Sequence, residues 1–186
     1  MHIIGGEKRG SKLALCTSKA VRPTAQRTRE ALFNILQGGR FSHCLSEATV
    51  IDLFAGTGAI GLEALSRGAR SCVFVEQDQD ALQILQANIS KLKMKDCAHI
   101  LAKDARQIHS WPGPRADLVF ADPPYSSSLA GEGIHQLLVA NAVVQQVLFV
   151  VETRKTDNFH LGPEFVLVDS RVYGIARLNF FTLAHR

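Results

Sequence analysis

The chain has 186 residues, of which 46% are hydrophobic and 20% are charged, and its net charge is +4. This length fits one domain with a short appendage, and the composition excludes a disordered chain because it supplies enough apolar surface for a packed core. The N-terminus lacks a signal-peptide pattern and no apolar run reaches membrane-spanning length. We therefore expect a cytoplasmic protein without membrane contact.

Cysteine and histidine give no sign of a metal site. The four cysteines lie 28, 28 and 25 residues apart without a C-x-x-C pair, and the seven histidines are scattered without ligand spacing. We expect reduced thiols and no bound metal.

Positive charge is concentrated near the N-terminus. Residues 1–40 hold eight Lys and Arg against two Glu, a balance of +6, whereas residues 41–186 hold 13 against 15, a balance of −2. Lys and Arg neutralise phosphates and release their counterions, so this segment favours a polyanion as partner. An ordinary solvated surface would carry the same charges.

The first forty residues predict a small hairpin followed by a helix. Residues 2–6 and 12–15 are short strand candidates joined by a turn-prone link. Pro23 disfavours helical backbone at Arg22, and Thr24 is a good N-cap, so a helix over residues 25–36 is expected. We interpret residues 1–40 as a basic RNA-binding element and residues 41–186 as the main domain.

From residue 49 onward, strand and helix patterns alternate. The predicted strands, apolar almost throughout, cover residues 49–54, 71–75, 98–102, 116–121 and 147–151. The clearest helix spans residues 78–92, where apolar side chains recur with a 3.6-residue period. Apolar strands separated by helices indicate an α/β fold with a mostly parallel sheet covered on both faces. Two further strands, over residues 165–168 and 177–183, predict a final antiparallel hairpin.

A glycine-rich loop follows the first of these strands. Gly56, Gly58 and Gly61 match G-x-G-x-x-G between a strand and a helix, a pattern that permits a tight turn and close approach of a ligand. Glu76 ends the next strand, where a carboxylate can hold the two hydroxyls of a ribose. A nicotinamide or flavin dinucleotide would fit these features equally well.

Two further acidic residues favour S-adenosylmethionine over a dinucleotide. Asp52 precedes the glycine loop, where a carboxylate would repel a pyrophosphate but suits an ammonium and a sulfonium. Asp104 follows the third strand and is placed to meet an adenine amino group. Each of the two residues would also serve as an ordinary helix or turn cap, so the joint spacing with Glu76 carries the interpretation.

The tetrapeptide Asp122-Pro123-Pro124-Tyr125 follows the fourth strand of the main domain. Consecutive prolines fix the backbone and remove amide donors, which leaves carbonyl oxygens facing the crevice. The Asp122 carboxylate and the Pro123 carbonyl can then bind the two hydrogens of an exocyclic amine and aim its lone pair at a methyl carbon. Tyr125 offers a face on which a base can stack. An ordinary proline turn is the alternative.

With these residues, the chain resembles the class I methyltransferases and, within them, the bacterial 16S ribosomal RNA guanine-N2 methyltransferase family. The segments that carry this resemblance are Ile3-Ile4-Gly5-Gly6 with Arg9-Gly10, Arg22-Pro23-Thr24 with Arg27 and residues 29–34, residues 52–69, and residues 122–125. The resemblance implies a Rossmann-like, doubly wound sheet of seven strands with an antiparallel final hairpin and a basic N-terminal element that helps to hold RNA.

The resemblance also implies the ligands and the residues that bind them. S-adenosylmethionine is the expected cofactor and S-adenosylhomocysteine the product, in a cradle formed by Asp52, Phe54, Ala55, Gly56, Gly58, Glu76, Asp104 and Ala105. The expected partner is small-subunit ribosomal RNA or an assembling 30S particle, contacted by Arg9, Lys12, Arg22, Arg27 and Arg29. We expect a monomer that methylates the guanine N2 through residues 122–125.

Three other functions remain open from the sequence. They are an adenine-N6 methyltransferase of DNA or RNA, a dinucleotide-dependent oxidoreductase, and a cofactor-binding RNA module without turnover. Asp-Pro-Pro-Tyr alone is shared with other amino-methyltransferases, and the Arg-Pro-Thr segment is what favours ribosomal RNA.

Overall fold

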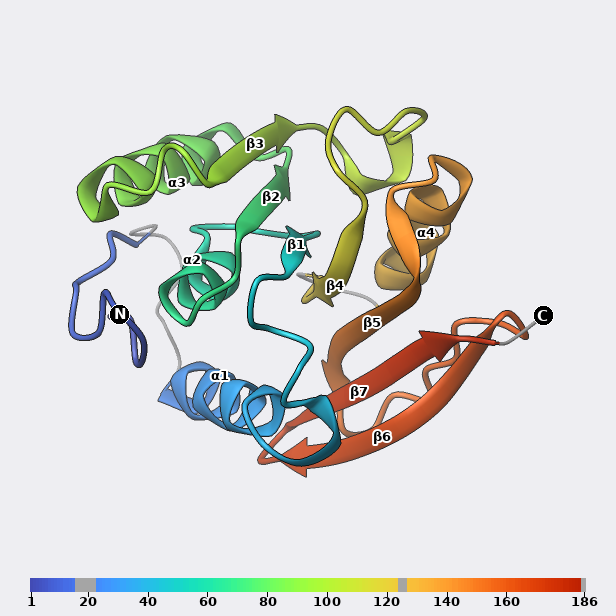
Figure 1. The fold of residues 1–186 in the computed structure, drawn as a ribbon. Helices are drawn as coiled ribbons and strands as arrows, with labels where there is room; N and C mark the ends of the chain where they lie inside the picture. The colour runs from blue at the N-terminus through green and yellow to red at the C-terminus, as the bar shows by residue number, and fades with distance from the viewer. Residues whose placement is uncertain (16–22, 124–126, 185–186) are drawn as a thin grey trace.

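A seven-stranded sheet with the order β3-β2-β1-β4-β5-β7-β6 forms the centre of the molecule (Figure 1). The computed structural model describes residues 1–15, 23–123 and 127–184. The strands are β1 (Thr49–Asp52), β2 (Ser71–Glu76), β3 (Ala98–Ala102), β4 (Ala116–Ala121), β5 (Val143–Arg154), β6 (Phe165–Tyr173) and β7 (Ala176–Leu183). Strands β1 to β5 pair in parallel, and β7 is inserted antiparallel between β5 and β6. This topology confirms the predicted α/β fold with its antiparallel final hairpin.

Helices cover both faces of the sheet. They are α1 (Pro23–Leu36), α2 (Ala59–Ser66), α3 (Gln79–Leu92) and α4 (Ser127–Val139), with short 3-10 helices η1 (Gly39–Phe41) and η2 (Ala105–Gln107). Helices α1, α2 and α3 pack on a first core through residues such as Phe33, Leu62 and Leu85, whereas α4 packs on a second core through Ile134 and Leu137. Within the described ranges, no helix is long and apolar enough to cross a membrane.

The expected N-terminal hairpin is present in a reduced form. One antiparallel bridge joins His2 to Lys12, and the Ile3 N–H donates to the Ser11 carbonyl at 3.0 Å. The two strand candidates are therefore a loop closed by one bridge, since residues 5–11 turn too tightly for a longer ladder. Ile3 and Leu13 are buried in the first core, which attaches this loop to the main domain.

A buried glutamate in α2 holds the N-terminal loop in place. Glu63 is 0% exposed, and its two carboxylate oxygens accept the N–H groups of Ile4 and Gly5, each at 2.8 Å. Arg67 donates to the same carboxylate at 2.7 Å, and the Arg29 Nε lies 3.9 Å from it. A buried charge is tolerated only where such partners compensate its lost hydration.

Replacement of Glu63 should destabilise the whole fold. We expect Glu63→Gln to lower the free energy of unfolding by about 3 to 5 kcal/mol, because two guanidinium groups would remain buried without their counter-charge. Urea denaturation followed by circular dichroism measures this change. The control is Glu47→Gln, whose exposed pair with Arg70 at 3.4 Å should contribute under about 1 kcal/mol. Equal losses in the two variants would contradict the role of Glu63 as an anchor.

Candidate functional site

Acidic side chains gather at the carboxyl ends of four adjacent strands. Asp52 ends β1, Glu76 ends β2, Asp122 follows β4 and Glu152 lies near the end of β5. In each strand the residue two positions earlier faces the first core: Val50, Phe74, Phe120 and Val150. Because side chains alternate along a strand, all four carboxyl groups belong to the same face of the sheet. We call these four residues the carboxylate row.

The register of the paired strands determines how far along its strand each residue of the carboxylate row lies relative to the others. Asp52 pairs with Phe74 in β2 and with Phe120 in β4, so Glu76 and Asp122 stand two residues beyond Asp52. The adjacent pair Ala121 and Val151 brings Asp122 level with Glu152. The strand order β2-β1-β4-β5 therefore places the turn after β1 directly beside the segment after β4.

The glycine turn after β1 is built around Glu76. The Gly56 N–H donates to the Glu76 carboxylate at 2.7 Å, and the Gln77 and Asp78 N–H groups donate to its other oxygen at 2.8 Å. Gly58 has a φ of +82°, and a Cβ there would overlap the Leu85 side chain. Gly56 has a φ of +53° with open space beside it, so this part of the turn can be approached closely by a ligand.

Asp52 is the most deeply buried residue of the carboxylate row. It is 2% exposed and accepts the Gly61 N–H at 2.9 Å, which fixes the start of α2. Burial, together with the charges of Asp122 and Glu76, raises its pKa to about 7, against the lowering effect of the Gly61 hydrogen bond. The residue thus supports the glycine turn and adds negative charge beneath it.

The remaining cradle residues lie around the same turn. Asp104 caps η2 through the Arg106 N–H at 2.9 Å, and an ion pair with the Arg106 guanidinium lowers its pKa. Ala55 and Ala105 are buried, and Phe54 is partly buried against the second core. The capping role that the sequence left open for Asp104 is present in the structure.

The segment after β4 lies at the same edge of the sheet. Asp122 and Pro123 are described, whereas Pro124 and Tyr125 lie outside the described residues. Burial of the Asp122 carboxyl raises its pKa to about 6, and the residue as a whole keeps an exposed surface. Asp122 is therefore a member of the row that a ligand can reach.

Glu152 was not foreseen from the sequence. It follows the apolar run of β5, and burial together with the Asp122 charge raises its pKa to about 8. The signal that would have found it is the strand alternation, since Glu152 stands two residues beyond Val150 as Asp122 stands two residues beyond Phe120.

The RNA contact candidates divide into exposed and buried residues. Arg9, Lys12 and Arg27 are exposed, and Arg22 lies outside the described residues. Arg29 corrects our expectation, because it is 5% exposed and its guanidinium donates to the His2 carbonyl at 2.9 Å. Its helix position directs it at the buried Glu63, so it holds the N-terminal loop and does not face a partner.

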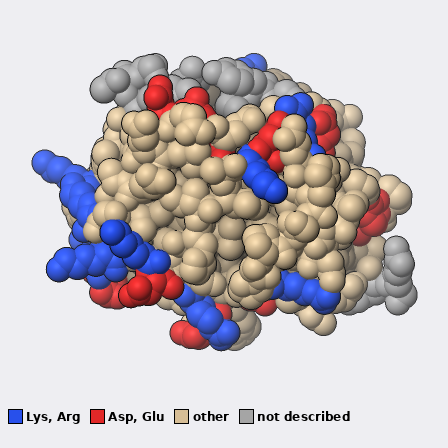
Figure 2. All heavy atoms as spheres, turned by 90° about the horizontal axis from the view of Figure 1, so that it is seen from above, with Lys and Arg blue, Asp and Glu red and all other residues tan. Residues whose placement is uncertain are grey.

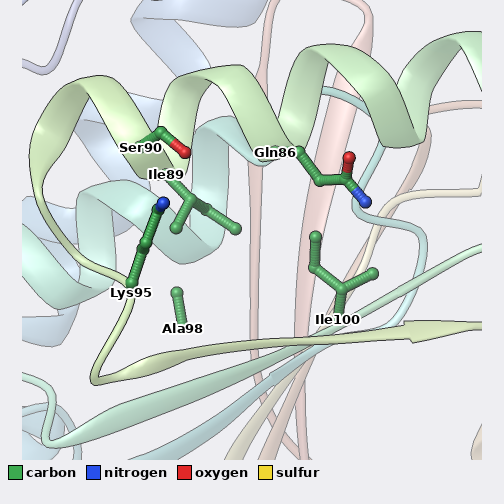
Figure 3. Close-up of a pocket in the computed structure, with 6 residues that line it drawn as sticks. All are labelled: Gln86, Ile89, Ser90, Lys95, Ala98 and Ile100. Carbon is green, nitrogen blue, oxygen red and sulfur yellow. The ribbon is translucent and has the colours of Figure 1, made fainter.

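A cavity of about 320 Å³ lies between α3 and β3 (Figure 3). Gln86, Ile89 and Ser90 line it from α3, Ala98 and Ile100 line it from β3, and Lys95 lies in the turn between them. Ala98 begins β3 and Lys95 lies in the turn before it, at the amino end of the strand, whereas the carboxylate row lies at the carboxyl ends of the strands. The cavity is therefore separate from the row.

The site fits an extended cationic ligand. A turn with one open glycine lies beside four carboxyl groups, two of which raise the pKa of a third by their charge. A sulfonium with an ammonium would relieve this crowding, whereas a pyrophosphate would worsen it. Together with the sheet order, these features define a class I methyltransferase.

Comparisons with known proteins agree with this class. The family described as conserved hypothetical protein 95 matches residues 1–182. Ribosomal RNA small subunit methyltransferase D of Haemophilus influenzae is 32% identical over 97% of this chain and 93% of its own length. The chain thus belongs to the ribosomal RNA small subunit methyltransferase D family.

Solved structures share the fold over most of the chain. The Escherichia coli protein yhhF, named as a methyltransferase, superposes with a TM-score of 0.84 at 30% identity and covers 100% of this chain and 99% of its own. A 16S rRNA guanine-N2 methyltransferase of Thermus thermophilus, in complex with AdoMet and guanosine, has a TM-score of 0.69 at 20% identity. It covers 91% of this chain and 45% of its own, so it supports the fold alone.

The buried Asp52 should make stability depend on pH. Its raised pKa of about 7 means that its contribution to stability is complete below about pH 4 and is lost as pH rises through 7. Asp52→Asn keeps an acceptor for the Gly61 N–H and is neutral at every pH. Between pH 5 and 8 the free energy of unfolding should fall less in Asp52→Asn than in the parent protein. The difference between the two falls should be roughly 2 to 3 kcal/mol.

Urea unfolding at both pH values measures this difference. Asp80→Asn, an exposed position in the first turn of α3, is the control and should follow the parent protein. Parallel pH curves for Asp52→Asn and the parent would show that Asp52 is not the titrating group.

Proposed function

We propose that this protein transfers a methyl group from S-adenosylmethionine to the exocyclic N2 of a guanine in 16S ribosomal RNA. The observation that carries the proposal is the carboxylate row at the ends of paired strands. Because β1 pairs with β4, the Gly56 turn that follows β1 lies beside Asp122 and Pro123, which follow β4. Membership of the family of ribosomal RNA small subunit methyltransferase D supports the same reaction class.

The row and the glycine turn would hold the methyl donor. S-adenosylmethionine supplies an activated methyl group as a sulfonium. The half-buried Glu76 carboxylate keeps a free lone pair on the oxygen that accepts the Gly56 N–H, and this lone pair suits a ribose hydroxyl. Asp52 supplies negative charge beneath the donor, and the Gly56 turn allows close backbone approach. Asp104 and Ala105 border the space expected for adenine.

Asp122 and Pro123 would hold the amine. The carboxylate and the Pro123 carbonyl accept the two N–H hydrogens, which directs the nitrogen lone pair at the methyl carbon. The new N–C bond forms from that lone pair while the C–S bond breaks toward sulfur, and the Asp122 carboxylate accepts the proton that the nitrogen loses. Positioning of this kind can contribute about 7 to 11 kcal/mol.

The basic N-terminal element of residues 1–40 would help to hold the RNA. Arg9 and Lys12 project from the loop that Glu63 anchors, and both are exposed. Lys and Arg also gather at the side of the molecule where α3 lies, among a few acidic groups (Figure 2). Phosphate contacts of this type position a nucleic acid without reading its sequence.

A methyl-transfer assay tests the substrate. Full-length protein is incubated with labelled S-adenosylmethionine and either under-modified 30S particles, naked 16S RNA or DNA, and the methylated base is mapped by mass spectrometry. We expect N2-methylguanine in the ribosomal RNA. Methyladenine as the sole product would support the adenine-N6 alternative instead, and the absence of any transfer would reject the proposal.

Removal of the Asp122 carboxylate should stop the chemistry and spare donor binding. We expect Asp122→Ala to lower kcat by about 10² to 10⁴-fold, because the amine loses its oriented acceptor and its proton acceptor. Single-turnover kinetics and calorimetric binding of S-adenosylmethionine measure the two effects. Asp80→Asn serves as the matched control at an exposed site. Transfer by Asp122→Ala at the parent rate would remove the assigned role.

Neutralising the N-terminal loop should weaken RNA binding in a salt-dependent manner. For Arg9→Gln with Lys12→Gln we expect the slope of log affinity against log salt to fall by about one to two units. Filter binding to 16S RNA over a salt series measures the slope. Arg70→Gln, an exposed control paired with Glu47, should leave it unchanged. An unaltered slope in the double variant would place the RNA elsewhere.

A further inference from the structure

Glu152 stands level with Asp122 on the neighbouring strand. Ala121 pairs with Val151, and Phe120 and Val150 both face the first core, so the next residue of the same parity in each strand is an acid. Neighbouring strands lie about 4.8 Å apart. The two carboxyl groups are therefore direct neighbours at the end of the row.

No cation in the described part of the chain neutralises this pair. On the other side of β5, Glu152 is opposite the apolar Leu178 of β7, and beyond it lies Arg171 of β6. The Arg171 guanidinium is held by Asp169 at 2.9 Å. From α1, Arg29 is directed at Glu63 instead.

The Glu152 carboxyl also has no hydrogen-bond partner among residues 1–15, 23–123 and 127–184. Two such carboxyl groups cannot both ionise cheaply, so one of them retains a proton. Of the two, Glu152 holds it more firmly, because burial and then the Asp122 charge raise its pKa to about 8. Asp122 is left ionised, as the binding of an amine requires.

We propose that Glu152 is a positioning residue of the methyl-donor site, which carries a proton while the site is empty and releases it when a cationic donor binds to the carboxylate row. The inference rests on the proposed function, since the cation is the sulfonium of S-adenosylmethionine. Glu152 acts through the charge of the row and needs no contact with the donor.

The proton release gives Glu152 a part in distinguishing donor from product. A nearby positive charge favours the ionised carboxylate and lowers its pKa, so binding of the donor releases a proton at pH values below about 8. Affinity for the donor then rises with pH, by at most about tenfold per pH unit for one proton. S-adenosylhomocysteine lacks the sulfonium charge, so its binding releases less.

Isothermal titration calorimetry of the full chain tests the inference. Binding of S-adenosylmethionine and of S-adenosylhomocysteine is measured at pH 7.5 in two buffers that differ in ionisation enthalpy, which yields the number of protons released. For the parent protein we expect more protons to be released on binding of S-adenosylmethionine than on binding of S-adenosylhomocysteine. In Glu152→Gln this excess should fall by at least half, with donor affinity reduced less than tenfold. The control Glu47→Gln, at an exposed site, should match the parent.

The outcomes separate the inference from the proposed function. Parent protein that binds neither ligand would reject the proposed function. Equal proton release by the parent and by Glu152→Gln would overturn the role of Glu152. Complete loss of donor binding in a folded Glu152→Gln would also overturn it, because that result means that Glu152 contacts the donor directly. Circular dichroism establishes folding, and Glu152→Asp, which retains a carboxyl group, should restore the excess if Glu152→Gln does not fold.

Discussion

Mutual repulsion within the carboxylate row is the constraint around which this site is organised. Strand alternation and the parallel register leave Asp52, Glu76, Asp122 and Glu152 on one face at neighbouring strand ends. Burial raises the pKa of Asp52 and of Glu152, and the charge of the neighbouring Asp122 raises both further. A cation bound at this sheet edge would offset the crowded negative charge, which is the physical basis of the proposed affinity for a sulfonium donor.

The apolar body of the protein makes this arrangement possible. The Asp52 carboxylate is fixed by the Gly61 N–H, and Gly61 itself lies against Phe74, where a Cβ would overlap the ring. Gly58 is likewise pressed against Leu85 of α3. The glycine turn is thus shaped from below by the first core, while Gly56 keeps its open side for a ligand. Packing and binding make separate demands on glycines of the same loop.

The sequence predicted the bounds of the interior strand β4 more accurately than those of the edge strand β6, for a physical reason. Strand β4 begins and ends where its largely apolar run does, because helices on both faces of the sheet favour apolar side chains along such a strand. β6 was expected over residues 165–168 but extends to Tyr173, because an edge strand tolerates polar side chains such as Asp169 and Ser170 that conceal its length.

Site residues were predictable where a motif fixes them and not where only three-dimensional pairing does. The glycine turn and Glu76 follow from local sequence, whereas Glu152 is recognisable only once the register of β4 with β5 is known. Arg29 shows the opposite error. The family resemblance and its charge suggested a nucleic-acid contact, yet its position in α1 faces the buried Glu63. Counting basic residues therefore overstates the surface that is available to a polyanion.

The same buried charges connect the two parts of the proposed machinery. Glu63 binds the N-terminal loop through Ile4 and Gly5, and α2, on which Glu63 lies, begins at the turn that Asp52 fixes. The loop that displays Arg9 and Lys12 is consequently carried on the helix that opens the donor cradle. A rigid connection of this kind would keep a bound RNA in a constant position relative to the methyl donor, which in-line transfer demands.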